Sequence, residues 1–385
     1  MKEKPMAKSE ISRLVKKALV VGGGIAGMAA AIRLRERDVA VDLVDIDPDW
    51  RVYGTGITLS ILTMRALCDL GFARELLEKG SGQDGLTMFD AKGNLITRLS
   101  SPRLYSEDVP GEGGILRPVL HKLMSQKVRA LGADIRLGVK VESLCDDGGG
   151  VDVAFSDAAR ARYDIVLGAD GLFSNMRDRL FPEAPKPQFT GQACWRVLFD
   201  IPEGWDSNRM YIGQKVKLGF TLCAPDKMYM YLLETVPTNP RVHEADYVPK
   251  LRDMMAEFGG TVARLREEIT PRHDINYRPL EAIILEETWF RGRTVLLGDA
   301  AHATTPHLGS GAGMAVEDAI ALVQELDKGD SINAAFGRYL LRRLPRGKFV
   351  VGNSLKLGEL EMAGAPMAEM ASLMGQCFQE IAKPY

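Results

Sequence analysis

The sequence predicts an α/β fold in which a parallel sheet carries an inserted antiparallel sheet and a helical C-terminal tail. The parallel sheet is predicted by three short apolar runs, each of which ends abruptly in glycine, with a carboxylate beside the glycine in the second and third. They open the segments 20–30, 166–177 and 295–319. In an open parallel sheet, ligands bind outside the carboxyl ends of such strands. We therefore expect segments that are far apart in the sequence to surround one ligand.

The first segment lies in a strand–helix–strand pattern. Residues 17–21 are an apolar run, residues 25–37 place Ala, Met, Leu and Ile at helical spacing, and residues 39–46 return as a second strand. A Gly-x-Gly-x-x-Gly sequence joins the first strand to the helix. In this context the glycines are typical of a Rossmann-type dinucleotide site, and we favour that interpretation over a plain structural turn.

Each glycine of this sequence has an expected role. Gly22 makes the tight turn, Gly24 lets the backbone approach a pyrophosphate, and Gly27 lets helix and strand pack closely. The free N–H groups and the positive dipole end of the helix then face the phosphates. Asp45, at the end of the second strand, is placed to accept hydrogen bonds from a ribose. The pattern does not choose between FAD and NAD.

Composition excludes several classes of protein. Lysine and arginine (49) nearly balance aspartate and glutamate (51), so charge gives no case for nucleic-acid binding. Five scattered cysteines without CxxC spacing predict neither a disulfide framework nor structural zinc, and the histidines show no metal-ligand spacing. We find no signal peptide and no stretch that could span a bilayer, so we expect a cytoplasmic protein without stable membrane association.

Between the second and third segments the chain is rich in short β-type runs, which predict an antiparallel sheet from 188 to 285, with helical spacing at 247–258 and 262–268. A hairpin is expected over 86–99, and three short strands over 133–155. The tail from 331 onward is expected to be mostly helical. Its arginine-rich stretch 338–348 is interpreted as a solvated helix face interrupted by Pro345.

The second and third segments carry more specific motifs. The second contains Gly168-Ala169-Asp170-Gly171, followed by Ser174 and Arg177, and the third begins Gly298-Asp299-Ala300-Ala301-His302. They resemble the DG and GD motifs of single-component flavin-dependent aromatic hydroxylases, the para-hydroxybenzoate hydroxylase type. The run HATTPHLGSGAGMAVEDA is especially similar to the salicylate hydroxylase branch. The three motifs stand in the family's order from residue 18 to residue 320.

The resemblance implies a monooxygenase that binds FAD and consumes NADH or NADPH as a transient co-substrate. It would hydroxylate a phenolic or aromatic-acid substrate with O2, through a flavin C4a-hydroperoxide. No separate NAD(P)H domain is expected, because no second Gly-x-Gly-x-x-Gly follows. Two alternatives remain: a flavoprotein reductase or oxidase on the same fold, and an NAD-binding module without flavin. We expect a monomer or a homodimer.

The resemblance also implies a set of FAD-binding residues. Asp45 stands where the family usually has glutamate, and Ile46 stands where a basic residue often follows, a contact that Arg51 could supply. Met314 replaces the asparagine of many relatives. The full predicted set is Gly22, Gly24, Ala26, Gly27, Asp45, Arg51, Arg117, Asp170, Asp299, Pro306, Gly311, Ala312, Gly313 and Met314.

Within this set, Arg117 is expected to reach the FAD phosphate and ribityl region, and Asp299 to bind the ribityl chain. Asp170 is linked to both FAD and nicotinamide. The N–H groups that open the helix at Gly311 would stabilise negative charge on reduced flavin.

The inserted sheet divides the chain into the following predicted domains. The FAD-binding domain comprises 1–83, 101–182 and 289–330, the substrate domain comprises the hairpin 84–100 and 183–288, and 331–385 form the helical C-terminal segment.

Three residues are candidates for contact with the substrate. Arg196 could pair with a substrate carboxylate, or could hold the domain interface at a sheet edge. Tyr211 could donate a hydrogen bond to a phenol oxygen, or could be a packed strand residue. His307 is the best-placed group for proton transfer at neutral pH, or is a loop histidine bonded to backbone. His302 is expected to brace the loop of the third motif.

Overall fold

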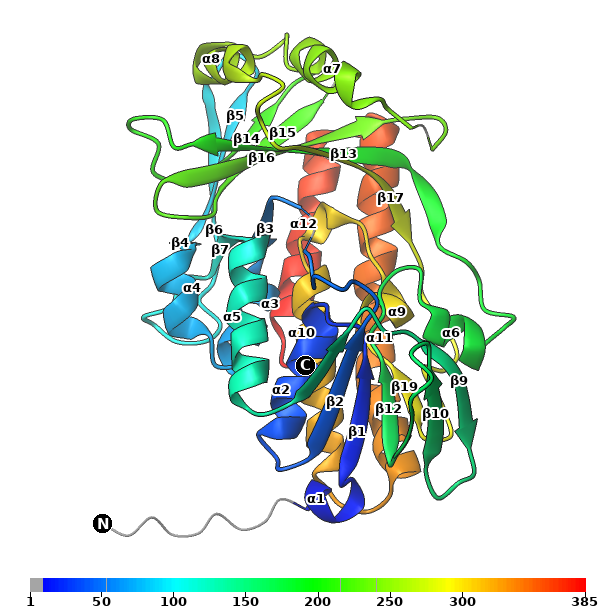
Figure 1. Cartoon of the computed structure of the whole chain (residues 1–385). Coiled ribbons are helices and arrows are strands. Elements are labelled where there is room, and N and C mark those ends of the chain that lie inside the picture. The colour runs from blue at the N-terminus through cyan, green and yellow to red at the C-terminus, as the bar shows by residue number, and fades with distance from the viewer. Residues whose placement is uncertain (1–9, 53, 215, 240) are drawn as a thin grey trace.

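The computed structural model describes residues 10–52, 54–214, 216–239 and 241–385. A six-stranded sheet forms the centre of the lower half of the molecule in Figure 1, in the order β18-β19-β12-β1-β2-β8. All neighbouring strands are parallel except β18 and β19. The strands, in sheet order, are Phe290–Arg291, Thr294–Leu296, Ile165–Gly168, Lys17–Val21, Ala40–Asp45 and Asp134–Leu137.

The strand–helix–strand unit predicted from the sequence is present. β1 covers the predicted residues, α2 spans Ile25–Arg35, and β2 ends at Asp45. α2 packs on α10 (Gly311–Leu326) and on α5 (Arg117–Ala130). Because α2 is alanine-rich and buried along most of its length, these helices and the sheet share one hydrophobic core.

A seven-stranded sheet covers this half from above in Figure 1, in the order β17-β13-β16-β15-β14-β5-β6. Its strands pair antiparallel, except that β5 of the predicted hairpin joins β14 in parallel. Two helices, α7 (Tyr247–Met254) and α8 (Gly260–Glu268), lie above it after the short η1 (Glu244–Asp246). The strands, in sheet order, are Ile275–Ala282, Gln188–Asp200, Lys227–Thr235, Lys217–Leu222, Asn208–Ile212, Gly85–Asp90 and Leu95–Ser100.

Two small antiparallel sheets complete the β structure. One joins β3 (Gly56–Leu59), β7 (Glu112–Leu116) and β4 (Ser81–Gln83), next to α3 (Ile61–Asp69) and α4 (Ala73–Lys79). The other consists of β9, β10 and β11, which span Val141–Asp146, Val151–Phe155 and Arg160–Tyr163. The three strands expected over 133–155 are therefore divided, because β8 pairs with β2 in the parallel sheet.

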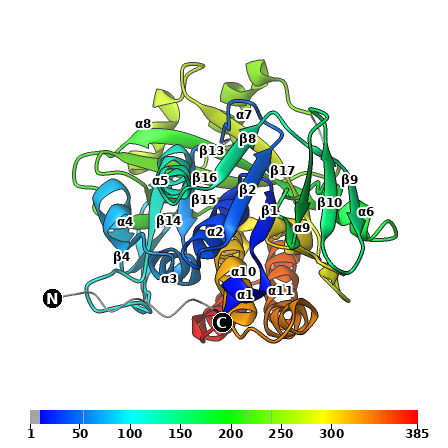
Figure 2. The ribbon, with the colours of Figure 1, turned by 60° about the horizontal axis from the view of Figure 1, so that its bottom comes forward.

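The C-terminal segment consists of two helices, as the sequence predicts. α11 spans Ile332–Met362 and α12 spans Met367–Ala382. α11 runs along α10 and reaches the underside of the seven-stranded sheet, and Figure 2 shows α10 and α11 side by side from below. The remaining short helices are α1 (Ile11–Leu14), α6 (Asn175–Leu180), α9 (Asp299–His302) and η2 (Pro306–Leu308). Within the described part of the chain, no helix has both the length and the apolar character needed to cross a membrane.

Candidate active site

The three motif loops meet at one edge of the parallel sheet. The N–H of Ala169 donates to the carbonyl of Val21 at 2.8 Å, and the N–H of Leu297 donates to that of Gly168 at 2.9 Å. The guanidinium of Arg177 then donates to the carbonyl of Ala300 at 3.2 Å. Hydrogen bonds therefore connect the first loop to the second and the second to the third, so the loops bound a common site.

The glycines of the first loop occupy three different environments. Gly22 has φ +105°, and a Cβ there would lie 2.4 Å from the carbonyl oxygen of Ala169. A Cβ on Gly27 would lie 1.9 Å from the carbonyl oxygen of Gly22. Gly24 is exposed at the N-terminus of α2, and a Cβ there would meet no atom within 4 Å. This geometry fits the tight turn, the close packing and the open approach to a phosphate that the sequence predicts.

Asp45 holds the loop through the backbone. Its carboxylate accepts from the N–H of Gly23 at 2.6 Å and from that of Asp47 at 2.8 Å. Each carboxylate oxygen has a second lone pair, so a ribose contact remains geometrically open. Arg51 is exposed and pairs with Asp47 at 2.9 Å. Sequence reasoning missed Trp50, whose indole N–H donates to the carbonyl of Gly23 at 2.9 Å.

Asp170 caps the helix that follows the second motif. Its carboxylate accepts from the hydroxyl of Ser174 at 2.5 Å and from the N–H of Met176 at 3.0 Å. Both contacts lie at the N-terminus of α6, where a negative charge is favourable. Asp170 therefore fixes the loop whose backbone borders the site.

Asp299 and Arg117 lie close enough for their charges to interact, beside the third motif. Asp299 is accessible to solvent, yet the protein around it raises its pKa by desolvation, an effect that His302 and Arg117 oppose. Arg117 begins α5 and interacts electrostatically with Asp299 and with Arg196. Among the described residues, neither the Asp299 nor the Arg117 side chain has a hydrogen-bond partner.

Two adjacent carboxylates of α10, Glu317 and Asp318, hold the third motif against α11. Asp318 accepts from the N–H of Gly298 at 2.9 Å and from Arg343 at 2.7 Å, and lies 2.5 Å from the Nε2 of His302. Burial would raise the pKa of Asp318, but His302 and Arg343 outweigh it and lower the pKa to about 2. His302 thus braces this loop, as expected.

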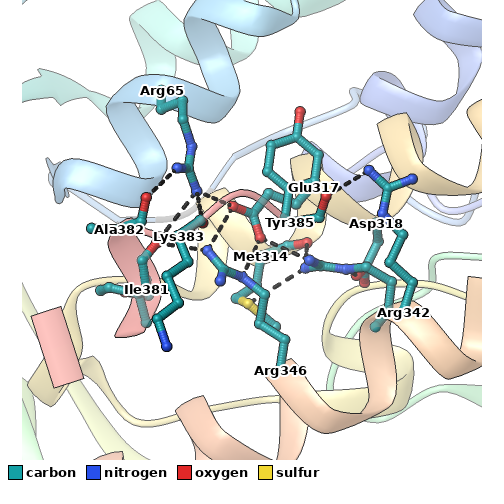
Figure 3. A network of polar contacts seen from close by, with 12 residues as sticks. Arg65, Met314, Glu317, Asp318, Arg342, Arg346, Ile381, Ala382, Lys383 and Tyr385 are labelled. Atoms are coloured by element: carbon teal, nitrogen blue, oxygen red, sulfur yellow. Dashed lines mark hydrogen bonds and ion pairs between the residues drawn. The ribbon is translucent and has the colours of Figure 1, made fainter. Parts of the chain in front are cut away.

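Glu317 is the centre of the rest of this network (Figure 3). Its carboxylate accepts from Arg65 at 3.1 Å, from Arg343 at 2.8 Å and from Arg346 at 2.8 Å. Arg65 and Arg346 also donate to backbone carbonyls at the end of α12, including that of Ile381. The network therefore joins α3, α10, α11 and α12 around the helix whose N-terminus faces the site.

This network corrects the prediction of a solvated helix face over 338–348. Arg343 is fully buried, and α11 continues without interruption through Pro345. The missing N–H of Pro345 leaves the carbonyl of Leu341 without its helical partner, and Leu341 is 77% exposed, so water can serve that carbonyl. The stretch is helical, as predicted, but its arginine Arg343 faces the protein interior and not the solvent.

Of the four backbone N–H groups predicted to bind the flavin at the N-terminus of α10, only three are free of a partner within the helix. Gly311, Ala312 and Gly313 occupy the first turn, where N–H groups have no partner within the helix. The N–H of Met314 already donates to Ser310 at 2.9 Å, and the carbonyl of Met314 accepts from Arg343. Met314 is buried, and its sulfur also contacts Arg343. The structure therefore turns Met314 away from the site. Of the two other predicted members, Ala26 is buried against Gly298, and Pro306 begins η2.

A row of side chains crosses the lower face of the seven-stranded sheet. Arg196 lies between Tyr231 on β16 and Asn276 on β17, and Tyr231 lies opposite Gly219 on β15. The Tyr231 ring covers Gly219, since a Cβ there would lie 2.1 Å from the ring. Among the described residues, the Arg196 guanidinium has no hydrogen-bond or ion-pair partner. The row thus presents an unpaired cation beside a phenol.

Tyr229 places this face next to the lower half of the molecule. Its ring covers Gly56 on β3, and its hydroxyl bonds to Thr58. Sequence reasoning assigned Tyr229 and Tyr231 to one strand face and to the core. Tyr229 is 3% exposed, and Tyr231 packs against a small cluster of Cys194, Leu233 and Leu280, so both assignments are confirmed. The opposite face of β16 carries Met228, Met230 and Leu232, which belong to the larger core above the sheet. The alternation was visible in the sequence, but nothing in it showed which face the helices cover.

Tyr211 lies on the opposite, upper face, which corrects its assignment as a substrate contact. It is 5% exposed, stacks on Phe89 at 5.1 Å between ring centroids, and packs against Phe220. These residues belong to the core between the sheet and the helices α7 and α8. The alternative weighed from the sequence, a packed strand tyrosine, describes this position.

His307 points away from the first loop, toward α11. Its Nδ1 lies 2.8 Å from the hydroxyl of Thr305, and its Nε2 lies 3.6 Å from Glu361, which pairs with Lys217 at 2.5 Å. Burial, reinforced by the charge of Lys217, lowers the pKa of His307 to about 3. This lowered pKa favours the neutral imidazole at neutral pH, which disfavours the proton-transfer role predicted from the sequence.

The residues present fit a flavin dinucleotide. The open position of Gly24 and the N–H groups of α2 suit a pyrophosphate, and the accessible Asp299 carboxylate can accept hydrogen bonds from ribityl hydroxyls. Arg117 supplies an unpaired cation between the loops and the upper sheet. The described residues include no cluster of three or more His, Cys, Asp or Glu side chains suited to a metal ion.

Comparison with known proteins identifies the family. Residues 16–354 match the family described as FAD binding domain. A Bacillus subtilis protein, YetM, whose name assigns it provisionally to the FAD-dependent monooxygenases, is 29% identical over 373 residues, covering 96% of this chain and 100% of that protein. The 2-heptyl-3-hydroxy-4(1H)-quinolone synthase of Pseudomonas aeruginosa is 31% identical over 311 residues, covering 80% and 79%.

A solved structure shares the fold. Klebsiella pneumoniae HpxO, complexed with FAD and uric acid, matches this structure with a TM-score of 0.82 at 23% identity, covering 96% of this chain and 93% of that chain. The family match spans most of the chain, and the loops it includes form the connected site described above. The protein therefore belongs to the FAD-binding-domain family and is an FAD-dependent monooxygenase.

Proposed function

We propose that this enzyme uses NADH or NADPH and O2 to hydroxylate a phenolic or other acidic aromatic substrate that binds beneath Arg196. The unpaired Arg196 guanidinium on the lower sheet face is the single observation that carries the proposal. A half-buried cation without a protein anion favours an anionic ligand, because the ion pair compensates the cost of partial desolvation. The quinolone and the uric acid named for the relatives are flat, oxygenated rings of the kind that such a site suits.

Each neighbour of Arg196 has a role in this proposal. The Tyr231 hydroxyl, whose pKa is raised by burial and by nearby Tyr229, stays protonated and donates to a substrate oxygen. Asn276, on the other side of Arg196, can donate or accept. The upper sheet closes over the ring and excludes water, which would otherwise compete for these hydrogen bonds.

The lower half holds the cofactor. Gly24 and the N-terminus of α2 would hold the pyrophosphate, Asp45 the ribose, and Asp299 and Arg117 the central part of FAD. The N–H groups of Gly311–Gly313 would hold the flavin ring. FAD, when bound, supplies the acceptance of hydride from NAD(P)H and the activation of O2.

The function is tested with purified protein, FAD, NADH or NADPH and a panel of phenols and aromatic acids. We expect that one class of substrate stimulates oxidation of the donor and yields a product that carries one oxygen atom from labelled O2. Stimulated oxidation that ends in hydrogen peroxide or reduced substrate, with no labelled product, would show a reductase or an oxidase instead.

The role of Arg196 is tested by its replacement with methionine. Arg196→Met should lower kcat/KM by roughly 10- to 150-fold, mainly through KM, because a hydrogen bond to a charged group contributes about 1.5–3 kcal/mol. Flavin content should stay unchanged. The control is Arg264→Met, since Arg264 is exposed on α8, beyond the opposite face of the sheet. Equal effects of the two substitutions on KM would exclude Arg196 from the substrate site.

A further inference from the structure

A groove with a volume of about 430 Å³ is lined by other residues than the row formed by Arg196, Tyr231 and Asn276. It runs between the start of β13, the loop that leads into η2, and one face of α11. Its lining combines apolar side chains with polar ones, and its two charged residues, Lys186 and Glu359, are exposed and pair with Asp178 and Lys356. We call the three polar residues Gln192, Ser354 and His307 its floor and the apolar residues its walls. The wall residues include Phe189, Ile283, Ile284, Val351 and Leu355. Such a groove has the size and the lining of a site for a small organic molecule.

Two side chains of the floor are buried without partners. Gln192 is 1% exposed and Ser354 is fully buried, and among the described residues neither side chain has a hydrogen-bond partner. A serine inside a helix usually bonds to a carbonyl one turn earlier, but the hydroxyl of Ser354 does not. Unpaired polar groups at this depth are costly, so both are arranged for a ligand that hydrogen-bonds to them.

Gly358 leaves room for this floor. A Cβ on Gly358 would lie 2.9 Å from the Oε1 of Gln192, and 3.0 Å and 3.3 Å from the Cε1 and Nε2 of His307. Both side chains therefore face the same position on α11. The Nε2 of His307 is also buried without a hydrogen bond among the described residues, so a third polar atom borders the floor.

We propose that this groove binds a neutral, flat aromatic ring that carries an amide or lactam edge. An amide pairs with the Gln192 amide through one donated and one accepted hydrogen bond, whichever way the Gln192 amide is turned. The floor offers no free charge for an ion, because Glu361 is paired with Lys217 and His307 is neutral. The apolar walls then cover the two faces of the ring.

Two molecules of the proposed reaction carry this chemistry: the nicotinamide ring of the electron donor, and a substrate with a lactam edge. Only the identity of the natural ligand, donor or substrate, rests on the proposed function; the binding of an amide or lactam ring in the groove does not. Binding is therefore measured apart from turnover, so that failure of either proposal can be recognised without the other.

The test uses the FAD-containing enzyme in titration calorimetry, with nicotinamide and the neutral lactam 2-pyridone as probes. Nicotinic acid serves as the ligand control, because it keeps the ring but replaces the amide by a carboxylate. We expect saturable binding of at least one probe and much weaker binding of nicotinic acid. Nicotinamide alone would indicate the donor as the source, and 2-pyridone alone a lactam substrate.

Gly358→Ala should weaken binding of that probe at least about tenfold, because the added methyl group displaces the Gln192 amide. Gln192→Leu should do the same without adding bulk. Gly352→Ala is the matched control and should leave binding unchanged, since Gly352 lies on the same helix with no atom within 4 Å of a Cβ. The proposal is overturned if neither probe binds at millimolar concentration, if nicotinic acid binds equally well, or if Gly358→Ala and Gly352→Ala behave alike.

Discussion

Replacing Gly24 with valine is expected to abolish FAD binding and leave the apoprotein folded. A side chain at this position meets no protein atom within 4 Å, and the backbone there has an ordinary negative φ, so the substitution causes no clash. The same open space is where a pyrophosphate would approach the N-terminus of α2. Flavin absorbance per protein after gel filtration measures the loss, and circular dichroism measures the fold.

Substitutions at two other glycines serve as controls that distinguish loss of FAD binding from loss of the fold. Gly27→Ala should destabilise the protein itself, because its Cβ would lie 1.9 Å from the carbonyl oxygen of Gly22. Gly352→Val, on the exposed side of α11, should change neither property. Wild-type flavin content in Gly24→Val would mean that the pyrophosphate does not bind at this loop.

Asp318→Ala is expected to lower the free energy of unfolding by about 3–5 kcal/mol, because it leaves the buried Arg343 without one of its two carboxylates. It also frees the N–H of Gly298 and the ring of His302, which Asp318 holds at the third motif. We therefore expect flavin retention to fall with stability. Urea unfolding at neutral pH, with and without added FAD, measures both effects.

A surface pair provides the control. Arg74 and Glu78 lie 3.9 Å apart on α4, and both side chains are exposed. Glu78→Ala should change the free energy of unfolding by less than about 1 kcal/mol, since water and salt already screen that pair. A similarly small change in Asp318→Ala would contradict the structural role of the buried network.

Much of the fold could be predicted because the interactions that form its helices, strands and turns join residues that are close in the sequence. The turn at Gly22, the close packing at Gly27 and the periodicities of β1, α2 and β2 depend on residues within about one strand–helix–strand unit. The order of the three motifs then predicted that their loops meet, because parallel strands end at the same sheet edge. The hydrogen bonds between Val21, Ala169, Gly168 and Leu297 confirm that arrangement.

The sequence by itself therefore determined the nucleotide-binding half, the inserted sheet and the helical tail. Only the tertiary structure decided which sheet face carries the site, and so separated Arg196 from Tyr211. Strand alternation defines two faces but does not say which one the helices cover. In the same way, only the packing of α11 on α10 paired Arg343 with Glu317 and Asp318, because a charged residue is stable inside a protein only where a distant segment supplies its partner.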